Sequence, residues 1–164
     1  MGFFGRLLGA PSAPSAPSAP EEADYELEPR DDDEGGGFVV RRVSDGQRLS
    51  WQTLPKRHGI ESVKIVGVSY HHDALQDPSF APGQVLELVP EPDNPHDPNA
   101  VAVWNASQTL HVGYVPREYA AKVAKGDHRL GCMVIWETRN ESGQRVALRA
   151  LMVDERAKVR GVSI

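Results

Sequence analysis

The sequence predicts a small β-barrel or β-sandwich with many short strands, one short helix and a disordered tail in front. Three observations support this fold class. Short runs rich in β-branched and aromatic residues recur along residues 38–153, and turns rich in Gly, Pro, Asn and Asp separate them. Only residues 116–126 have helical periodicity. Residues 1–36 contain little that a core could bury.

The first 36 residues are predicted to be disordered. Residues 10–20 repeat Ala-Pro-Ser, and a proline at every third position removes helix and sheet hydrogen bonds. Residues 21–34 are mostly acidic, and three glycines follow them. Like charges with almost no apolar surface do not form a core.

The predicted elements then follow in order. Residues 38–43 and 48–51 flank the Asp45-Gly46 pair, which is a hairpin signal. A helix is predicted over 116–126, because Pro116 suits a first helical position and Tyr119 and Val123 form an apolar stripe. The remaining predicted strands are 63–70, 84–89, 100–104, 110–115, 132–138 and 144–153.

Charge is distributed unevenly along the chain. The formal net charge is −5 overall, but residues 1–36 carry −7 and residues 37–164 carry +2. The predicted folded part is therefore mildly basic, which leaves a nucleic-acid partner open and argues against a histone-like binder.

Cysteine content and hydropathy indicate in which cellular compartment the protein is expected. Cys132 is the single cysteine, so neither an intramolecular disulfide nor a four-thiolate zinc site can form. It lies in an apolar run that predicts a buried strand and an inert thiol. No apolar run approaches the ~20 residues that span a bilayer. We expect a cytoplasmic protein without a membrane partner.

One loop is unusual. Residues 90–99 contain four prolines, two Asn and two Asp between two apolar strands. Proline fixes φ, and Asn and Asp side chains bond their own backbone, so such a loop is stiff. It is either a well-made connector or a platform that holds side chains at fixed angles.

The segment Pro-Asp-Asn-Pro-His-Asp-Pro-Asn-Ala-Val-Ala-Val (92–103), with Val-Gly-Tyr-Val-Pro-Arg-Glu (112–118), resembles the HIRAN domain. Residues 66–70 resemble the strand that opens that domain. The resemblance covers about residues 61–153. We therefore expect a tail (1–36), an N-terminal β-hairpin extension (37–60), the HIRAN-like domain (61–153) and a C-terminal tail (154–164).

The resemblance implies a modified OB-like β-barrel that binds DNA, capturing the 3′-hydroxyl end of a single strand. It implies a non-enzymatic module without cofactors, accessory to DNA repair or stalled-fork processing beside a helicase or nuclease partner. His96 stands where DNA-binding members have a stacking tyrosine, and Ser69 replaces an arginine. The implied DNA-binding residues are Tyr70, Asn94, His96, Asp97, Tyr114 and Arg117.

The residue chemistry agrees with end binding. An acidic loop repels internal phosphates, but a carboxylate such as Asp97 accepts a hydrogen bond from a free sugar hydroxyl. Arg117, at the predicted helix start, can hold the last phosphate. Tyr70, His96 and Tyr114 offer flat faces for bases. Alternatively, Tyr114 is a core residue and Arg117 a solvated one.

The residues allow three other interpretations. Asp93, His96 and Asp97, or His71-His72-Asp73, could hold a metal, but neither set has the spacing of a helical zinc site. Larger family members are ATPases with zinc-binding modules, but this chain lacks the P-loop and the cysteines, so neither hydrolysis of acid anhydrides nor zinc binding is expected. A protein-interaction adaptor that uses the tail remains an alternative function.

Overall fold

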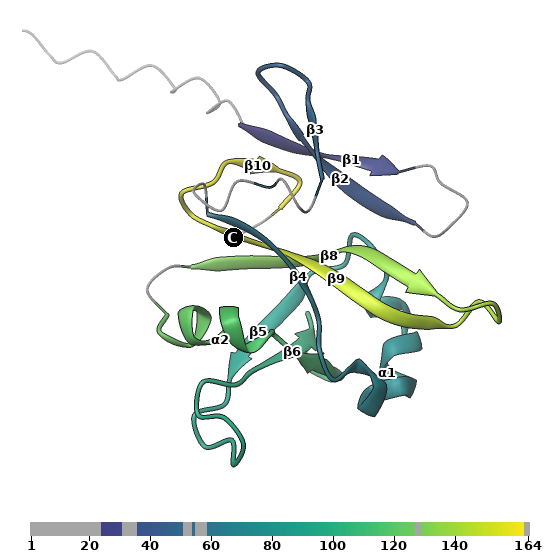
Figure 1. Ribbon diagram of the computed structural model, residues 1–164, viewed down its shortest axis with the longest axis vertical. Helices are drawn as coiled ribbons and strands as arrows, with labels where there is room; N and C mark the ends of the chain where they lie inside the picture. The colour runs from purple at the N-terminus through teal and green to yellow at the C-terminus, as the bar shows by residue number, and fades with distance from the viewer. Residues whose placement is uncertain (1–23, 31–35, 51–53, 55–58, 127–128, 163–164) are drawn as a thin grey trace, which may run out of the picture.

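Two long strands, β8 (Leu130–Arg139) and β9 (Arg145–Asp154), form the central hairpin of the computed structural model (Figure 1). The structure describes residues 24–30, 36–50, 54, 59–126 and 129–162. The larger sheet has the order β10-β1-β2-β8-β9-β4, with β3 beside β2. Its other strands are β1 (Tyr25–Arg30), β2 (Gly37–Arg42), β3 (Arg48–Leu49), β4 (Ile60–Lys64) and β10 (Val159–Arg160).

A second, three-stranded sheet has the order β5-β6-β7. Isolated bridges connect it to the rest of the fold, from Val85 to Met133 and from Val66 to Tyr114. Its strands are β5 (Leu86–Pro90), β6 (Val101–Asn105) and β7 (His111–Tyr114). The helical elements are α1 (His72–Gln76), α2 (Arg117–Ala124) and the 3₁₀ turns Val68–His71 and Pro78–Phe80.

The β8–β9 hairpin is covered on both faces. Cys132 and Val134 pack into a core shared with the small sheet and the helices. The alternate residues Met133 and Ile135 pack into a second core with Tyr25, Val40 and Leu49 from β1–β3. In Figure 1, β1–β3 lie above the hairpin, and α2 and the small sheet lie below it. Each large side chain in these cores contributes about 1.5–3 kcal/mol through burial.

The mainly β fold class predicted from the sequence is confirmed, because strands dominate the described residues and the predicted hairpins are present. The prediction of a single strand over residues 63–70 is wrong. Extended backbone ends at Gly67, whose φ of +75° starts a 3₁₀ turn that includes Tyr70. Helix α1 was missed because its five residues bury only Leu75 and have no helical period.

Residues 24–30 differ from the predicted tail. The composition of residues 1–36 indicates disorder, but residues 25–30 form β1, which pairs antiparallel with β2 and parallel with β10. Tyr25 is buried in the second core, and Glu28 accepts hydrogen bonds from Arg48. Cross-strand contacts therefore offset the charge repulsion among the acidic side chains of this segment. Residues 1–23 and 31–35 of the predicted tail lie outside the described residues.

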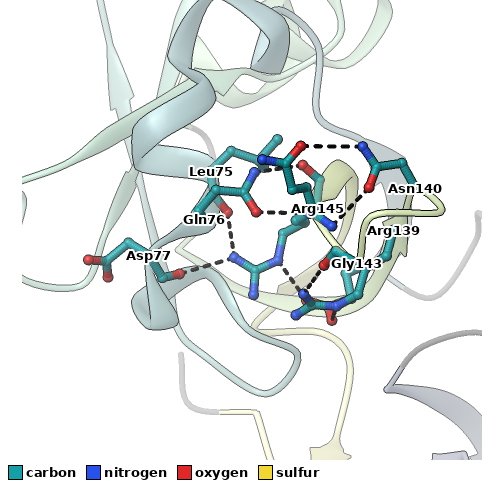
Figure 2. A network of polar contacts seen from close by, with 9 residues as sticks. Leu75, Gln76, Asp77, Arg139, Asn140, Gly143 and Arg145 are labelled. Carbon is teal, nitrogen blue, oxygen red and sulfur yellow. Dashed lines mark hydrogen bonds and ion pairs between the residues drawn. The ribbon is translucent and has the colours of Figure 1, made fainter.

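The buried Arg145 on β9 connects the β8–β9 hairpin to α1 through hydrogen bonds to Leu75 and Gln76 (Figure 2). Arg145 Nε donates to Glu137 Oε2 over 2.6 Å, and both side chains are about 95% buried (3% and 5% exposed). Arg145 also donates to the carbonyl oxygens of Leu75 and Asp77. The carboxylate and the two carbonyls accept hydrogen bonds from Nε and Nη1 of the guanidinium, so this network is a structural clamp rather than a reactive site.

Candidate functional site

The loop between β5 and β6 is held by its own side chains. Asn94 Oδ1 accepts the backbone N–H groups of His96 (3.0 Å) and Asp97 (3.3 Å). Asn94 Nδ2 donates to Glu91 Oε2 over 2.8 Å. These are the Asx-type turns that the Asn and Asp content predicts. Asn94 thus acts as the internal brace of the loop, which projects from the molecule in Figure 1.

Asp97 joins the loop to the start of α2. Its Oδ1 accepts the backbone N–H of Asn99 over 2.9 Å, and its Oδ2 accepts Nε–H of Arg117, also over 2.9 Å. The hydrogen bond from the Asn99 backbone and then the Arg117 guanidinium lower the pKa of Asp97 below its ordinary value. The carboxylate is therefore ionised at neutral pH.

Arg117 is the first residue of α2. Pro116 precedes the helix as its N-cap, with φ −55° and ψ 142°, rather than occupying the first helical position as the sequence suggested. The Arg117 side chain is 79% exposed although it pairs with Asp97. An exposed guanidinium at a helix N-terminus is well placed to meet an anion.

Tyr114, the last residue of β7, lines the same site. Its strand approaches Val66 closely, because Gly113 has φ +152° and a Cβ there would lie 2.4 Å from the Val66 carbonyl oxygen. Burial and then the charge of Glu91 raise the pKa of Tyr114, so the phenol stays neutral. Tyr114 is half-buried and faces the site instead of the core.

These residues surround one cavity of about 260 Å³. Five of the six residues that the sequence nominated line it, namely Asn94, His96, Asp97, Tyr114 and Arg117. The lining also has an apolar part, whose role in a site nothing in the sequence except hydropathy indicates. It consists of Val66, Ala100, Val115 and Ala120. The cavity thus combines one ion pair, two rings and an apolar floor.

Tyr70 is the exception among the nominated residues. It lies on the 3₁₀ turn Val68–His71, is 89% exposed and does not line the cavity. The turn nevertheless follows Val66, which lines the cavity and pairs with Tyr114. Tyr70 is therefore an exposed aromatic ring on an element that borders the site.

Sequence reasoning missed the histidine behind Tyr114. The His111 ring makes an edge contact with Tyr114 (centroids 4.8 Å apart), stacks on Trp104 (5.1 Å) and contacts His71 (4.3 Å). Burial and then the charge of His111 lower the pKa of His71. A period-two pattern through Tyr114 and Val112 places His111 on the opposite face of β7, so no sequence pattern couples His111 to Tyr114.

Neither candidate metal set is assembled. His71 packs on His111, whereas His72 lies 3.9 Å from Asp73, so the adjacent histidines have different neighbours. Among the residues that the structure describes, no three His, Cys, Asp or Glu side chains converge as metal ligands. Cys132 is buried, which raises its pKa to about 12. Within the same ranges, no helix is long and apolar enough to cross a bilayer.

A family model for the HIRAN domain matches residues 59–145, just over half of the chain. The chain belongs to the HIRAN domain family. The family is one of DNA-binding modules, so this HIRAN chain carries a DNA-binding domain. The match leaves out β1–β3 and nearly all of β9.

Two solved structures are similar to this HIRAN chain. The HIRAN domain of human HLTF has a TM-score of 0.47 and 20% identity, over 59% of this chain and 75% of that one. A protein from Lactobacillus plantarum has a TM-score of 0.43 and 26% identity, over 57% of this chain and 92% of that one. No curated protein matches the sequence.

Proposed function

We propose that the cavity between the β5–β6 loop and α2 binds the 3′-hydroxyl end of single-stranded DNA. The observation that carries the proposal is the arrangement of Asp97 and Arg117, an ionised carboxylate and an exposed guanidinium joined at 2.9 Å beside two rings. A strand end presents a hydroxyl donor, a phosphate and an unstacked base within one nucleotide. Each has a chemical counterpart in this cavity.

Asp97 is the proposed acceptor for the terminal hydroxyl. An ionised carboxylate offers about four lone-pair sites. The Asn99 N–H and Arg117 Nε–H occupy two of them, one on each oxygen. A sugar hydroxyl can therefore donate to Asp97 without displacing either bond, whereas a 3′-phosphate would bring a second anion against the carboxylate.

Arg117 is the proposed phosphate contact. Its Nε–H is used by Asp97, which orients the planar guanidinium and leaves the terminal nitrogens on an exposed side chain. Planar guanidinium groups bind phosphate oxygens in a bidentate way. His96 and Tyr114 in the cavity, and Tyr70 at its border, are the proposed stacking faces, each worth about 1–3 kcal/mol per base.

The proposed role is that of a non-enzymatic module, accessory to DNA repair or to processing of stalled forks beside a helicase or nuclease. The proposal is tested by fluorescence anisotropy with a labelled oligonucleotide that carries either a 3′-hydroxyl or a 3′-phosphate. We expect the hydroxyl-ended strand to bind about tenfold to a hundredfold more tightly, the range of a charge-assisted hydrogen bond of ~1.5–3 kcal/mol. Equal affinities would reject end recognition, and a chain that binds neither strand would leave the adaptor function as the better candidate.

A further inference from the structure

A larger cavity lies on the other face of the β8–β9 hairpin, between β2–β3 and β8. Its volume is about 460 Å³. Three arginines (Arg30, Arg48 and Arg149) and two aromatic residues (Phe38 and Trp136) line it, with aliphatic side chains between them. None of the described lining residues is an Asp or Glu. We call this cavity the arginine groove.

The arginine groove is separate from the proposed end site. Ile135, which lines the groove, packs into the second core, whereas Val134 beside it packs into the core under the small sheet. Of the five polar and aromatic residues named above, only Trp136 lies within the HIRAN match at residues 59–145. The N-terminal strands that the match omits therefore build most of this groove.

Trp136 is a fixed platform in the groove. β2 approaches β8 so closely that a Cβ on Gly37 would lie 2.5 Å from Cε3 of the indole. The Arg30 guanidinium carbon lies 4.4 Å from the centroid of the same ring. This is a cation–π contact, and a guanidinium plane over an indole forms a flat, positively charged surface.

The other two arginines bring positive charge to the same walls. Arg48 on β3 pairs with Glu28 on β1 and is still 67% exposed. Arg149 is half-buried and donates to Ser62 Oγ over 3.3 Å. Exposed and half-buried guanidinium groups beside flat rings match a ligand that repeats phosphates and planar bases.

We propose that the arginine groove binds internal nucleotides of a single-stranded nucleic acid, with a base on the Arg30–Trp136 platform and phosphates on the arginines. A cavity of this size fits the range typical of small-ligand sites and holds a nucleotide rather than a folded domain. An acidic peptide would satisfy the charges but would not use the flat platform. This inference rests on DNA binding by the family and does not depend on end recognition.

The test uses the full chain and a circular single-stranded oligonucleotide, which has no 3′ end. We expect the circle to bind, and the double variant Arg30→Gln/Arg48→Gln to weaken it about tenfold. Loss of two phosphate contacts should also flatten the dependence of log affinity on log salt by about 1.4. The matched control is Arg42→Gln/Arg160→Gln, which removes the same charge from β2 and β10 outside the groove and should leave binding unchanged.

A second measurement locates the strand directly. A circle substituted with 5-bromodeoxyuridine should photocrosslink to Trp136 or Phe38, identified by mass spectrometry of the peptides. The proposal is overturned if the circle does not bind, if the groove variant binds like the control, or if crosslinks map to the β5–β6 loop. Tighter binding of a polyglutamate peptide than of the circle would overturn it in favour of an acidic protein partner.

Each of the two proposals can be rejected without rejecting the other. Asp97→Asn should abolish the preference for 3′-hydroxyl ends and leave binding of the circle unchanged. Loss of circle binding in that variant would contradict a separate groove. An intact circle affinity in a protein that shows no end preference would reject only the end site.

Discussion

Arg117 and Asp97 form an ion pair in the lining of the proposed end site, with 2.9 Å between Nε and Oδ2. The pair joins the loop after β5 to the first residue of α2, two segments 20 positions apart. A substitution at either residue therefore changes the orientation of the other. Variants that test their separate roles must keep the geometry and change one property at a time.

Asp97→Asn is the sharpest such variant. The amide oxygen can still accept the Asn99 N–H, but the negative charge, the bond from Arg117 Nε–H and the charge-assisted bond to a hydroxyl are lost. We expect an unchanged melting temperature and a loss of about tenfold to a hundredfold in the preference for 3′-hydroxyl over 3′-phosphate ends, measured by anisotropy. Asp97→Ala removes the loop bond as well and should also lower the melting temperature. An intact end preference in a folded Asp97→Asn protein would make Asp97 a scaffold residue.

Arg117→Gln should weaken binding to all DNA sequences alike. Removal of one phosphate contact should flatten the salt dependence of log affinity by about 0.7 for a single strand. Lys122→Gln is the matched control, because Lys122 lies on the same helix, loses the same charge and pairs with Glu61 away from the cavity. Equal salt slopes for the two variants would show that Arg117 makes no phosphate contact.

Truncations at two positions should have different effects on stability. Deletion of residues 1–23 removes the Ala-Pro-Ser repeat and should leave the melting temperature unchanged. Deletion of residues 1–36 also removes β1, with the buried Tyr25 and the pairing to β2 and β10. We expect it to lower the melting temperature by about 5 °C or more. Equal melting curves for the two truncations would mean that β1 adds nothing to the fold.

Arg145→Met should be strongly destabilising. It leaves the Glu137 carboxylate 5% exposed without its buried partner, and two carbonyl groups lose a donor. The expected loss in the free energy of unfolding is about 3–5 kcal/mol, from urea denaturation. Arg139, which is 42% exposed, pairs with the same carboxylate. Arg139→Gln should lower the free energy of unfolding by less than about 1 kcal/mol. Similar losses for both variants would mean that burial does not make the Arg145–Glu137 pair more important for stability than the exposed Arg139–Glu137 pair.

Stability should fall as the pH drops below neutral because of His71. Burial and the neighbouring His111 lower its folded-state pKa, so the unfolded chain binds more protons once the pH falls toward 6.5. The loss of stability should grow until the pH passes the folded-state pKa. His71→Phe keeps a ring against His111 and should reduce the decrease in melting temperature between about pH 7.5 and 5.5. His72→Phe, on an exposed neighbour, should leave the decrease intact.

Five of the six nominated residues line one cavity, and one short segment supplies three of them. Asn94, His96 and Asp97 lie within four residues of one loop, and their turn chemistry is local. Arg117 follows Pro116 at a helix start that proline helps to mark. The position of Tyr114 was harder to predict. Its ring lines the cavity on a strand that approaches Val66 closely at Gly113, and this approach is not visible in the sequence.

Features that depend on distant pairing were not predictable. The acids of residues 26–28 indicate a solvated tail until Arg41 and Arg48 are known to form ion pairs with them. Likewise, Tyr70 belongs to a run of β-branched residues, and only the left-handed Gly67 turns that run into a 3₁₀ segment. Non-local contacts and single backbone conformations override local propensity in both cases.

The double covering of β8 and β9 has a practical consequence for anyone who expresses this domain alone. A fragment cut at residues 59–145 would end where β9 begins, leaving β4 and β8 without the strand that pairs with both. Extension to residue 154 would restore the pairing but would still expose Met133, Ile135, Leu151 and Val153, which β1–β3 cover. A bare apolar sheet face of this kind promotes aggregation. Recombinant fragments should therefore begin before Tyr25 and continue past Arg160.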